Sequence, residues 1–162
     1  MKNNFIRTAP YSMVTKLAFG YYPLKDDYIV LKMNSRLEVM RYSLKSDSWK
    51  EIDFPMEERA LISFSYDSVA INTNGAFHWL TRLPNKVSIL IFNLFSEKVI
   101  FNLFSEKVDD IPVQPSKEQR RGTYLQVLNG KLCFSLNSEY SVDIWGLMQY
   151  GKSNSWYKII RV

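Results

Sequence analysis

The 162-residue sequence contains a single cysteine and a single histidine, and both scarcities limit its chemistry. Cys133 has no second cysteine with which to form an internal disulfide, and no asparagine begins an Asn-x-Ser/Thr acceptor site, which fits a reducing compartment. Cys133 and His78 cannot supply the four ligands of a zinc site, and no suitably spaced carboxylates lie near them in the sequence. We therefore expect no metal ion, no cofactor and no catalytic residue.

Motifs of several enzyme classes are also absent. The sequence has no Gly-rich phosphate loop, no Gly-x-Ser-x-Gly turn and no His-Glu-x-x-His zinc motif. Its adjacent carboxylates, Asp26–Asp27 and Glu57–Glu58, are expected to be solvated turn residues, because neighbouring side chains point apart and seldom share a proton. These absences favour a binding protein over an enzyme.

No long apolar run is present either. The longest run with almost no charge, Val87–Phe92, is far shorter than the about 20 residues that cross a bilayer, so no membrane segment is expected. Met1–Thr15 has no apolar block and no cleavage site typical of a secretory signal. We expect an intracellular protein, in the cytoplasm, the nucleus or both.

Positive charge is in excess but is not concentrated. The 21 Lys and Arg residues outnumber the 16 Asp and Glu residues, which gives a net charge of +5. They are spread along the chain, and the one local group, Lys117–Arg121, contains Glu118. Because nucleic-acid binding needs several cations facing the phosphates, no nucleic-acid partner is expected.

Strand signals dominate what is present: hydrophobic residues make up 46% of the chain and aromatic residues 15%, in short runs separated by turns. Eight runs are predicted as strands, namely Leu17–Tyr22, Tyr28–Met33, Leu37–Leu44, Trp49–Phe54, Ser68–Thr73, Ala76–Leu80, Tyr124–Leu128 and Lys131–Leu136. Asn74–Gly75 and Asn129–Gly130 can adopt the positive φ angles of two-residue hairpins, and Pro23–Asp27 is predicted as a hairpin loop. Only Met56–Leu61 suits a turn or two of helix.

One six-residue phrase occurs three times. Each copy has, in order, a β-branched residue, two variable residues, an aromatic, a small or polar residue and Leu. The copies are Val39–Leu44, Ile89–Leu94 and Val142–Leu147. Their starts lie 50 and 53 residues apart, which is typical of a small sheet repeated around a propeller. Consecutive bulky residues in Phe77–Leu80 and Leu132–Phe134 indicate strands buried on both faces. The predicted fold is all-β, a partial kelch-like β-propeller of about three four-stranded antiparallel blades.

Equivalent places in the repeat are expected to have equivalent packing roles. His78 and Cys133 each lie three residues after a hairpin glycine, so both are predicted to pack in the core or between blades. The four tryptophans are expected mostly inside, wedged between blades: Trp49, Trp79, Trp145 and Trp156.

A nine-residue segment is duplicated in tandem. Ile91–Val99 is followed at once by an identical Ile100–Val108, and removing one copy shortens the second repeat interval to 44 residues. Side chains alternate between faces with period 2, so an insertion of nine turns every later side chain over unless the chain absorbs it. We expect two near-degenerate registers, with Phe95–Ile100 looping out or forming a short extra hairpin, and we assign the duplication no function.

Loops that differ between the repeats are the candidate protein contacts. Five are predicted: Asn34–Arg36, Lys45–Asp47, Thr81–Lys86, Gln114–Gly122 and Met148–Asn154.

Six groups of residues, in order along the chain, resemble the plant F-box-associated interaction domain. They are Leu17–Tyr21 with Pro23 and Asp26–Val30, Val39 with Tyr42–Leu44 and Ser48–Trp49, Asn74–Ala76 with His78–Leu80, Asn129–Leu132, Val142–Trp145, and Tyr150–Gly151 with Ser155–Trp156. The resemblance runs from about Leu17 to Ile159 and implies a domain over residues 17–162 after an N-terminal extension, residues 1–16.

The resemblance implies a substrate-recognition module of an SCF-type E3 ubiquitin ligase, with a protein substrate as partner and ubiquitin transfer performed by other subunits. Sixteen residues before Leu17 hold no F-box helices, so docking on the ligase adaptor is expected only if an F-box lies upstream. Two alternatives stay open at this point: a truncated, non-functional remnant, and a kelch-type enzyme or sugar-binding propeller.

Overall fold

The computed structural model describes residues 16–54, 63–64, 68–83, 86–103, 123–137, 140–152 and 155–162. These residues form three antiparallel sheets, here called blades I, II and III. Blade I contains, in order, β1 (Lys16–Tyr22), β2 (Asp27–Met33), β3 (Val39–Ser43) and β4 (Ser48–Ile52). Blade II contains β5 (Ser63–Phe64), β6 (Ile71–Thr73), β7 (Ala76–Leu83), β8 (Lys86–Asn93) and β9 (Lys98–Leu103). Blade III contains β10 (Thr123–Leu128), β11 (Lys131–Asn137), β12 (Val142–Leu147) and β13 (Trp156–Arg161).

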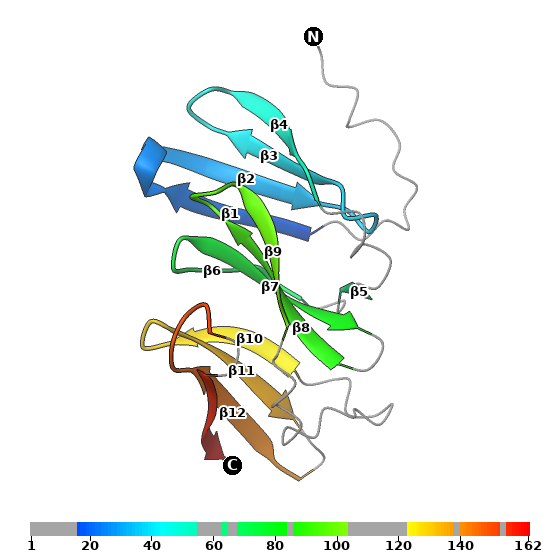
Figure 1. Cartoon of the computed structure of the whole chain (residues 1–162), viewed down its shortest axis with the longest axis vertical. Helices are drawn as coiled ribbons and strands as arrows, with labels where there is room; N and C mark the ends of the chain where they lie inside the picture. The colour runs from blue at the N-terminus through cyan, green and yellow to red at the C-terminus, as the bar shows by residue number, and fades with distance from the viewer. Residues whose placement is uncertain are drawn as a thin grey trace.

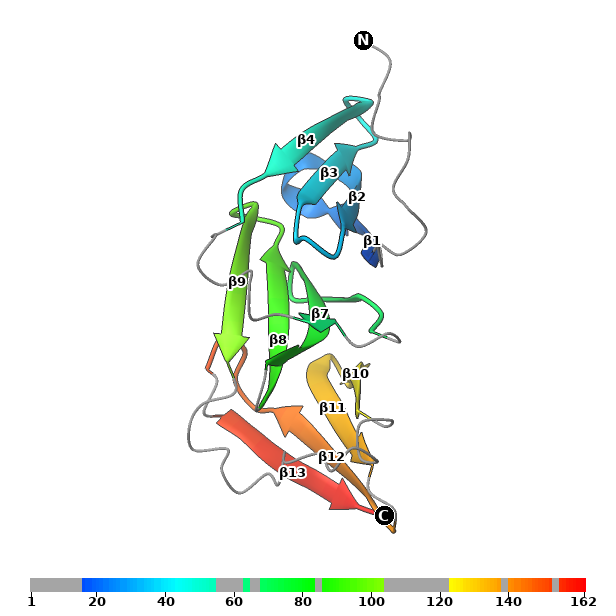
Figure 2. The ribbon, with the colours of Figure 1, turned by 90° about the vertical axis from the view of Figure 1, so that its right-hand side faces the viewer.

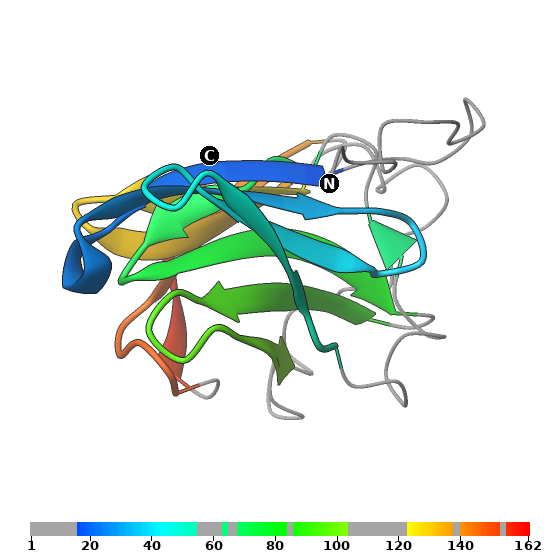
Figure 3. The same cartoon turned by 90° about the horizontal axis from the view of Figure 1, so that it is seen from above.

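The predicted all-β, propeller-like fold is confirmed, and the three blades do not close into a ring. They stack one above the next, with blade II between the other two (Figures 1 and 2). Seen along the stack, the strands of successive blades lie over one another (Figure 3). In blade II, β5 and β6 pair with different parts of β7 and together fill the place of one strand, so each blade has four strand positions.

Each junction between blades encloses a hydrophobic core. The larger core lies between blades I and II and includes Ile29, Leu31, Phe77, Trp79 and Phe92, all at most 1% exposed. A second core lies between blades II and III, where Ile89 and Ile91 meet Leu132 and Leu147. Successive side chains of a strand point to opposite faces of the sheet, so the side chains on one face of blade II pack in the first core and those on the other face pack in the second. The predicted burial of both strand faces is therefore confirmed for Phe77–Leu80 and Leu132–Phe134.

The three copies of the repeated phrase occupy the third strand position of each blade: the first spans β3, the second the C-terminal part of β8 and the third β12. Both predicted two-residue hairpins are present. Asn74 and Gly75 have φ angles of 52° and 67°, and Asn129 and Gly130 have φ angles of 50° and 74°. Those left-handed angles are the reason that asparagine and glycine stand in these turns.

Several predicted boundaries differ; the predicted strand Ser68–Thr73, for example, begins only at Ile71. The predicted strand Leu37–Leu44 begins at Val39, because Leu37 has a φ of 60° in a turn where the Asn34 side chain accepts hydrogen bonds from the Arg36 and Glu38 amides. Pro23–Lys25 is a single turn of 3-10 helix, η2, and the predicted helical turn Met56–Leu61 lies outside the described residues.

The expectation for the tryptophans holds in part. Trp79 is buried, Trp145 and Trp156 are half-buried, and Trp49 is exposed. Trp49 lies in β4 of the end blade, on the face that no described blade covers. Trp49 is therefore exposed to solvent because it lies in an end blade, whereas the same position in an inner blade would be buried.

The expectation for Asp27 is wrong, whereas its neighbour Asp26 is solvated as predicted. Asp27 is buried and accepts hydrogen bonds from the Ser43 hydroxyl and the Lys45 amide. Burial acts to raise the pKa of Asp27, but these hydrogen bonds to the charged form outweigh it and hold the pKa below its usual value. Asp27 thus fastens the β3–β4 turn to β2.

The duplicated segment does not loop out as expected. The first copy forms the end of β8, the turn Leu94–Glu97 and the start of β9, and the described part of the second copy, residues 100–103, continues β9, with Ile91 opposite Ile100. This is the same hairpin that joins β3 to β4, not an extra one. Sliding the chain by one copy would put Lys98 where Ile89 is buried and Glu97 where Ser88 is buried, so the two registers are not equivalent.

We expect removal of nine residues to leave the fold intact. Deleting either copy gives the same polypeptide, and it moves Ile111 into the position now held by Asn102, opposite Ile89. Blade I has buried Ile52 at the equivalent place, opposite Val39. The shortened chain should unfold in one cooperative transition, with a free energy of unfolding within about 1 kcal/mol of the full chain in a urea titration. Loss of cooperative unfolding would contradict this register.

Candidate functional site

The connections between strands gather at two opposite ends of the stack. The end called here the hairpin end carries the β1–β2, β3–β4, β6–β7, β8–β9, β10–β11 and β12–β13 connections, on the left of Figure 1. The β2–β3 and β11–β12 connections lie at the other end. This follows from antiparallel order, in which alternate connections share an edge.

The five predicted contact loops do not form one surface. Lys45–Asp47 and the described part of Met148–Asn154 lie at the hairpin end, whereas Asn34–Arg36 lies at the other end. Thr81–Lys86 is mostly strand, since β7 runs to Leu83 and β8 starts at Lys86. Gln114–Gly122 lies outside the described residues.

Glu97, in the turn of the duplicated segment, is the electrostatic centre of the hairpin end. Its carboxylate accepts hydrogen bonds from Lys25 Nζ at 2.7 Å and from Lys50 Nζ at 3.0 Å, and Arg41 Nε lies 3.8 Å away. All three cations belong to blade I, so Glu97 ties blade II to its neighbour. The Glu97 and Arg41 side chains are only 14% and 12% exposed, so water screens this contact weakly.

The pKa of Glu97 reports the strength of this contact. Burial acts to raise it, but the hydrogen bonds from Lys25 and Lys50 and the charge of Arg41 outweigh burial and lower the pKa to about 2. In the folded chain Glu97 therefore stays ionised at pH values well below 4.5.

Two neighbours of Glu97 fix the same turn by packing. Leu94 is buried in the core between blades I and II, and its amide donates to the Gly75 carbonyl. The Phe95 ring meets the Tyr22 ring edge-on at 6.1 Å and covers Gly75, where an added Cβ atom would collide with the ring. Gly75 is thus required by its φ angle and by the ring above it.

His78 fastens the other junction. As predicted, His78 and Cys133 are fully buried. His78 Nδ1 lies 3.1 Å from the Ile71 carbonyl, which can only accept, so Nδ1 carries the proton and Nε2 accepts from the Tyr150 hydroxyl at 2.8 Å. Burial lowers the pKa of His78, which keeps the ring neutral. The β12–β13 connection of blade III is thereby held against blade II.

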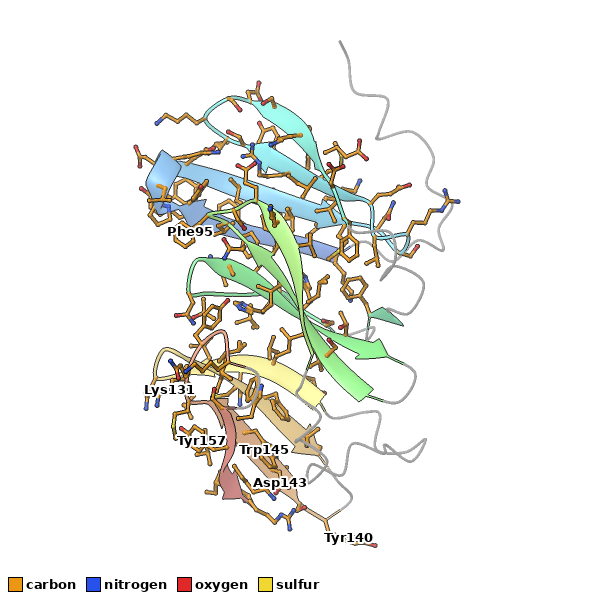
Figure 4. All side chains as sticks on the ribbon, in the orientation of Figure 1. Phe95, Lys131, Tyr140, Asp143, Trp145 and Tyr157 are labelled. Atoms are coloured by element: carbon orange, nitrogen blue, oxygen red, sulfur yellow. The ribbon has the colours of Figure 1, made fainter. Side chains whose placement is uncertain are left out.

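Apolar side chains stand exposed among these anchored turns. Leu24 is 70% exposed, Met148 66%, Phe95 48% and Tyr150 39%. Figure 4 shows Phe95 at the hairpin end and Tyr140, 88% exposed, at the far corner of blade III. Exposed apolar and aromatic groups on rigid supports are typical of protein-binding surfaces.

A second ionic cluster has a local role. Asp143 accepts two hydrogen bonds from Arg161, at 2.6 and 2.7 Å, and lies 3.0 Å from Lys158 Nζ. Chiefly through Arg161, these contacts lower the pKa of Asp143 to about 2. All three residues belong to β12 and β13, so the cluster secures the edge strand of blade III.

Sequence reasoning missed the three residues that hold the junctions, Phe95, Glu97 and Tyr150. Phe95 and Glu97 were set aside with the duplication, although their alignment with the β3–β4 turn could have identified them as turn residues. Tyr150 falls in a predicted loop, but its bond to His78 joins residues 72 apart in sequence.

No group of three or more His, Cys, Asp and Glu side chains suited to a metal ion occurs in the described part of the chain. Among those same residues, no helix is long and apolar enough to cross a membrane.

The sequence profile of the F-box associated beta propeller domain matches residues 4–162. The chain is 28% identical over 165 residues to F-box protein At4g22390 of Arabidopsis thaliana, covering 88% of this chain and 39% of that protein. It is 28% identical over 167 residues to F-box protein CPR1 of the same plant, with the same coverage. The chain thus spans about two fifths of the length of these relatives. No solved structure is significantly similar to it.

Glu97→Gln should lower the free energy of unfolding and should remove a contribution to it that is lost at acidic pH. The free energy of unfolding at pH 7 should fall by about 1–2 kcal/mol, because the Arg41 side chain loses its counter-charge. Folding lowers the pKa of Glu97 from 4.5 to about 2, so its contribution is present above pH 4.5 and is lost as pH falls toward 2. Urea titrations at pH 7, 4 and 3 should show the two proteins converging. A constant difference would contradict the role assigned to Glu97.

His78 should make the free energy of unfolding depend on pH just below neutral pH. It is the only histidine, and its pKa in the folded state lies below 6.5, so only the unfolded chain gains a proton as pH first falls below 6.5. The free energy of unfolding should be level between about pH 7 and 8 and should decline as pH falls below 6.5, with a slope of at most about 1.4 kcal/mol per pH unit. His78→Gln should flatten the slope between pH 7 and 5.5. An unchanged slope would exclude His78 as its source.

Proposed function

The chain belongs to the F-box associated beta propeller domain family, and from this premise we propose that it is the substrate-recognition module of an SCF-type E3 ubiquitin ligase receptor. Both relatives are named as F-box proteins, which supports this assignment. The module binds a protein and performs no chemistry of its own, and the ligase subunits transfer ubiquitin. This role belongs inside the cell, in the cytoplasm, the nucleus or both.

The hairpin end is the surface that we assign to the protein substrate. The observation that carries the assignment is the pairing of exposed apolar groups with anchored turns. Leu24 and Met148 project from turns that the Glu97 contacts and the His78–Tyr150 hydrogen bond hold in place. Rigid anchors reduce the entropy lost on binding, so few contacts can give useful affinity.

Charge at this end favours a partner with acidic groups near an apolar segment. Lys45, 65% exposed, and exposed Lys152 make no close ion pair with any described residue. Among these residues, Lys45 approaches a carboxylate only at 4.0 Å, that of the solvated Asp26. These lysines can therefore attract acidic side chains at the rim of the interface.

The ligase adaptor is a partner only of a polypeptide that carries an F-box upstream of this domain. In such a polypeptide the domain selects the substrate and the F-box recruits the ligase. An enzyme at the propeller centre has less support, because the described residues hold no metal-binding cluster and His78 is committed to Ile71 and Tyr150.

Leu24→Asp combined with Met148→Asp should weaken substrate binding strongly without unfolding the domain. Both side chains are exposed, and a buried apolar contact at an interface centre is worth about 1–2 kcal/mol, so the pair should weaken binding by at least about tenfold. Tyr140→Asp, at the opposite end, is the matched control. Proteins captured from plant extract by the wild type would be identified by mass spectrometry and their affinities measured by calorimetry.

A fusion of the chain to an F-box provides the functional readout. The fusion should shorten the half-life of the captured protein, the double variant should not, and the Tyr140→Asp fusion should act like the wild type. Equal binding by the double variant would place the site elsewhere. Failure to capture any protein that calorimetry confirms would contradict the recognition role.

A further inference from the structure

One face of blade I is not covered by any other described sheet. The face toward blade II holds Ala18, Ile29 and Leu31, so by strand alternation the opposite face holds Leu17, Phe19 and their partners. Pairing places four side chains in one row across this open face: Phe19, Val30, Tyr42 and Trp49. Tyr21 and Tyr28 extend the row, and the Phe19 and Tyr28 rings stack at 5.6 Å.

The repeat shows what such a face packs against. Tyr42 is the aromatic residue of the repeated phrase, and its equivalents are Phe92 and Trp145. Phe92 faces blade I and is 1% exposed in that core. Trp145 pairs with Phe134 on the side of blade III that faces blade II. In blades II and III this aromatic therefore faces the preceding blade, whereas no sheet of the described residues precedes blade I.

Trp49 repeats the pattern. Its equivalent, Trp156, packs against the core between blades II and III and meets the Phe134 ring at 4.9 Å. Trp49 contacts the Tyr42 ring at 5.2 Å within its own blade and is 38% exposed. The open face of blade I thus resembles the faces with which blades II and III pack against the blade before them.

Blade III exposes the other half. The first residue of the repeated phrase faces the next blade in both complete junctions, where Val39 and Ile89 are buried. Its equivalent, Val142, shares the open face of blade III with Ile144. Strand pairing aligns Ile144 with Ile160 and, through Ser135, with Tyr124. Ile160 is 48% exposed and Tyr124 49%.

We propose that two copies of this chain stack head to tail, blade III of each on blade I of the other, to form a closed six-bladed ring. Both new junctions repeat the pairing of faces already present between blades I and II and between blades II and III. Six blades fall within the four to eight of closed propellers. The contact is heterologous, because different faces meet, and heterologous contacts form rings when the rotation closes. The ring is independent of what the hairpin end binds.

The mass of the full 162-residue chain in solution tests the stoichiometry. Sedimentation equilibrium should give about 38 kDa, twice the 19.1 kDa of one copy. A mass of 19.1 kDa at every concentration would overturn the proposal. Species that grow without limit as concentration rises would overturn closure, because they would show an open chain of the same contacts.

Two single variants and their mixture test the geometry. Phe19→Asp damages blade I and Ile160→Asp damages blade III, and each side chain is exposed, so both proteins should fold with the wild-type circular dichroism spectrum. Each variant alone should be monomeric, because both junctions of its ring carry the change. Leu24→Asp, at the hairpin end, should remain dimeric as the control.

Mixing the two variants should restore dimers. In a mixed ring, one junction carries both changes and the other joins an unchanged blade I to an unchanged blade III. Recovery of dimer in the equimolar mixture, absent from either protein alone, is expected for a heterologous ring. If Phe19→Asp alone breaks the dimer and Ile160→Asp has no effect, two blade I faces meet each other and the proposal is wrong.

Discussion

Face-to-face stacking of sheets is the interaction on which the structure depends. Blade II contributes to two hydrophobic cores at once, and removing either neighbour would expose residues such as Phe92 or Ile89. Fully burying one side chain such as Phe92 is worth about 1.5–3 kcal/mol, more than the about 0–1 kcal/mol of an exposed ion pair. The polar contacts act at the edges, where Glu97 and the His78–Tyr150 pair fix the position of one sheet on the next.

The polar contacts that position the blades also fix the turns of the surface proposed for binding. The residues that hold the junctions lie in the connections at the hairpin end, so the turns that present Leu24 and Met148 are also parts of the clamps between blades. Such turns cannot move freely without loosening a junction. Recognition at this surface therefore relies on a shape that exists before the partner arrives.

The sequence was sufficient for the strands, for both Asn-Gly hairpins and for the blade count, because local alternation and turn chemistry determine these features. It was not sufficient for contacts between blades. The burial of Asp27 depends on a hydroxyl sixteen residues away, and the role of Glu97 depends on cations from another sheet. Trp49 was misjudged because the repeat rule assumes a neighbour on both sides, which an end blade lacks.

The path of the duplicated segment shows where this architecture tolerates added length. Among the described residues, β9 is the last strand of its sheet and pairs with β8 alone, so the second copy can continue this strand while the ladders of β7 and β8 keep their partners. The same insertion in β8 would turn each later side chain of that strand to the opposite face of the sheet, and side chains on both faces of β8 are buried in cores. Outermost strands are thus the positions at which a lineage of such proteins can acquire new segments between blades without rebuilding its interior.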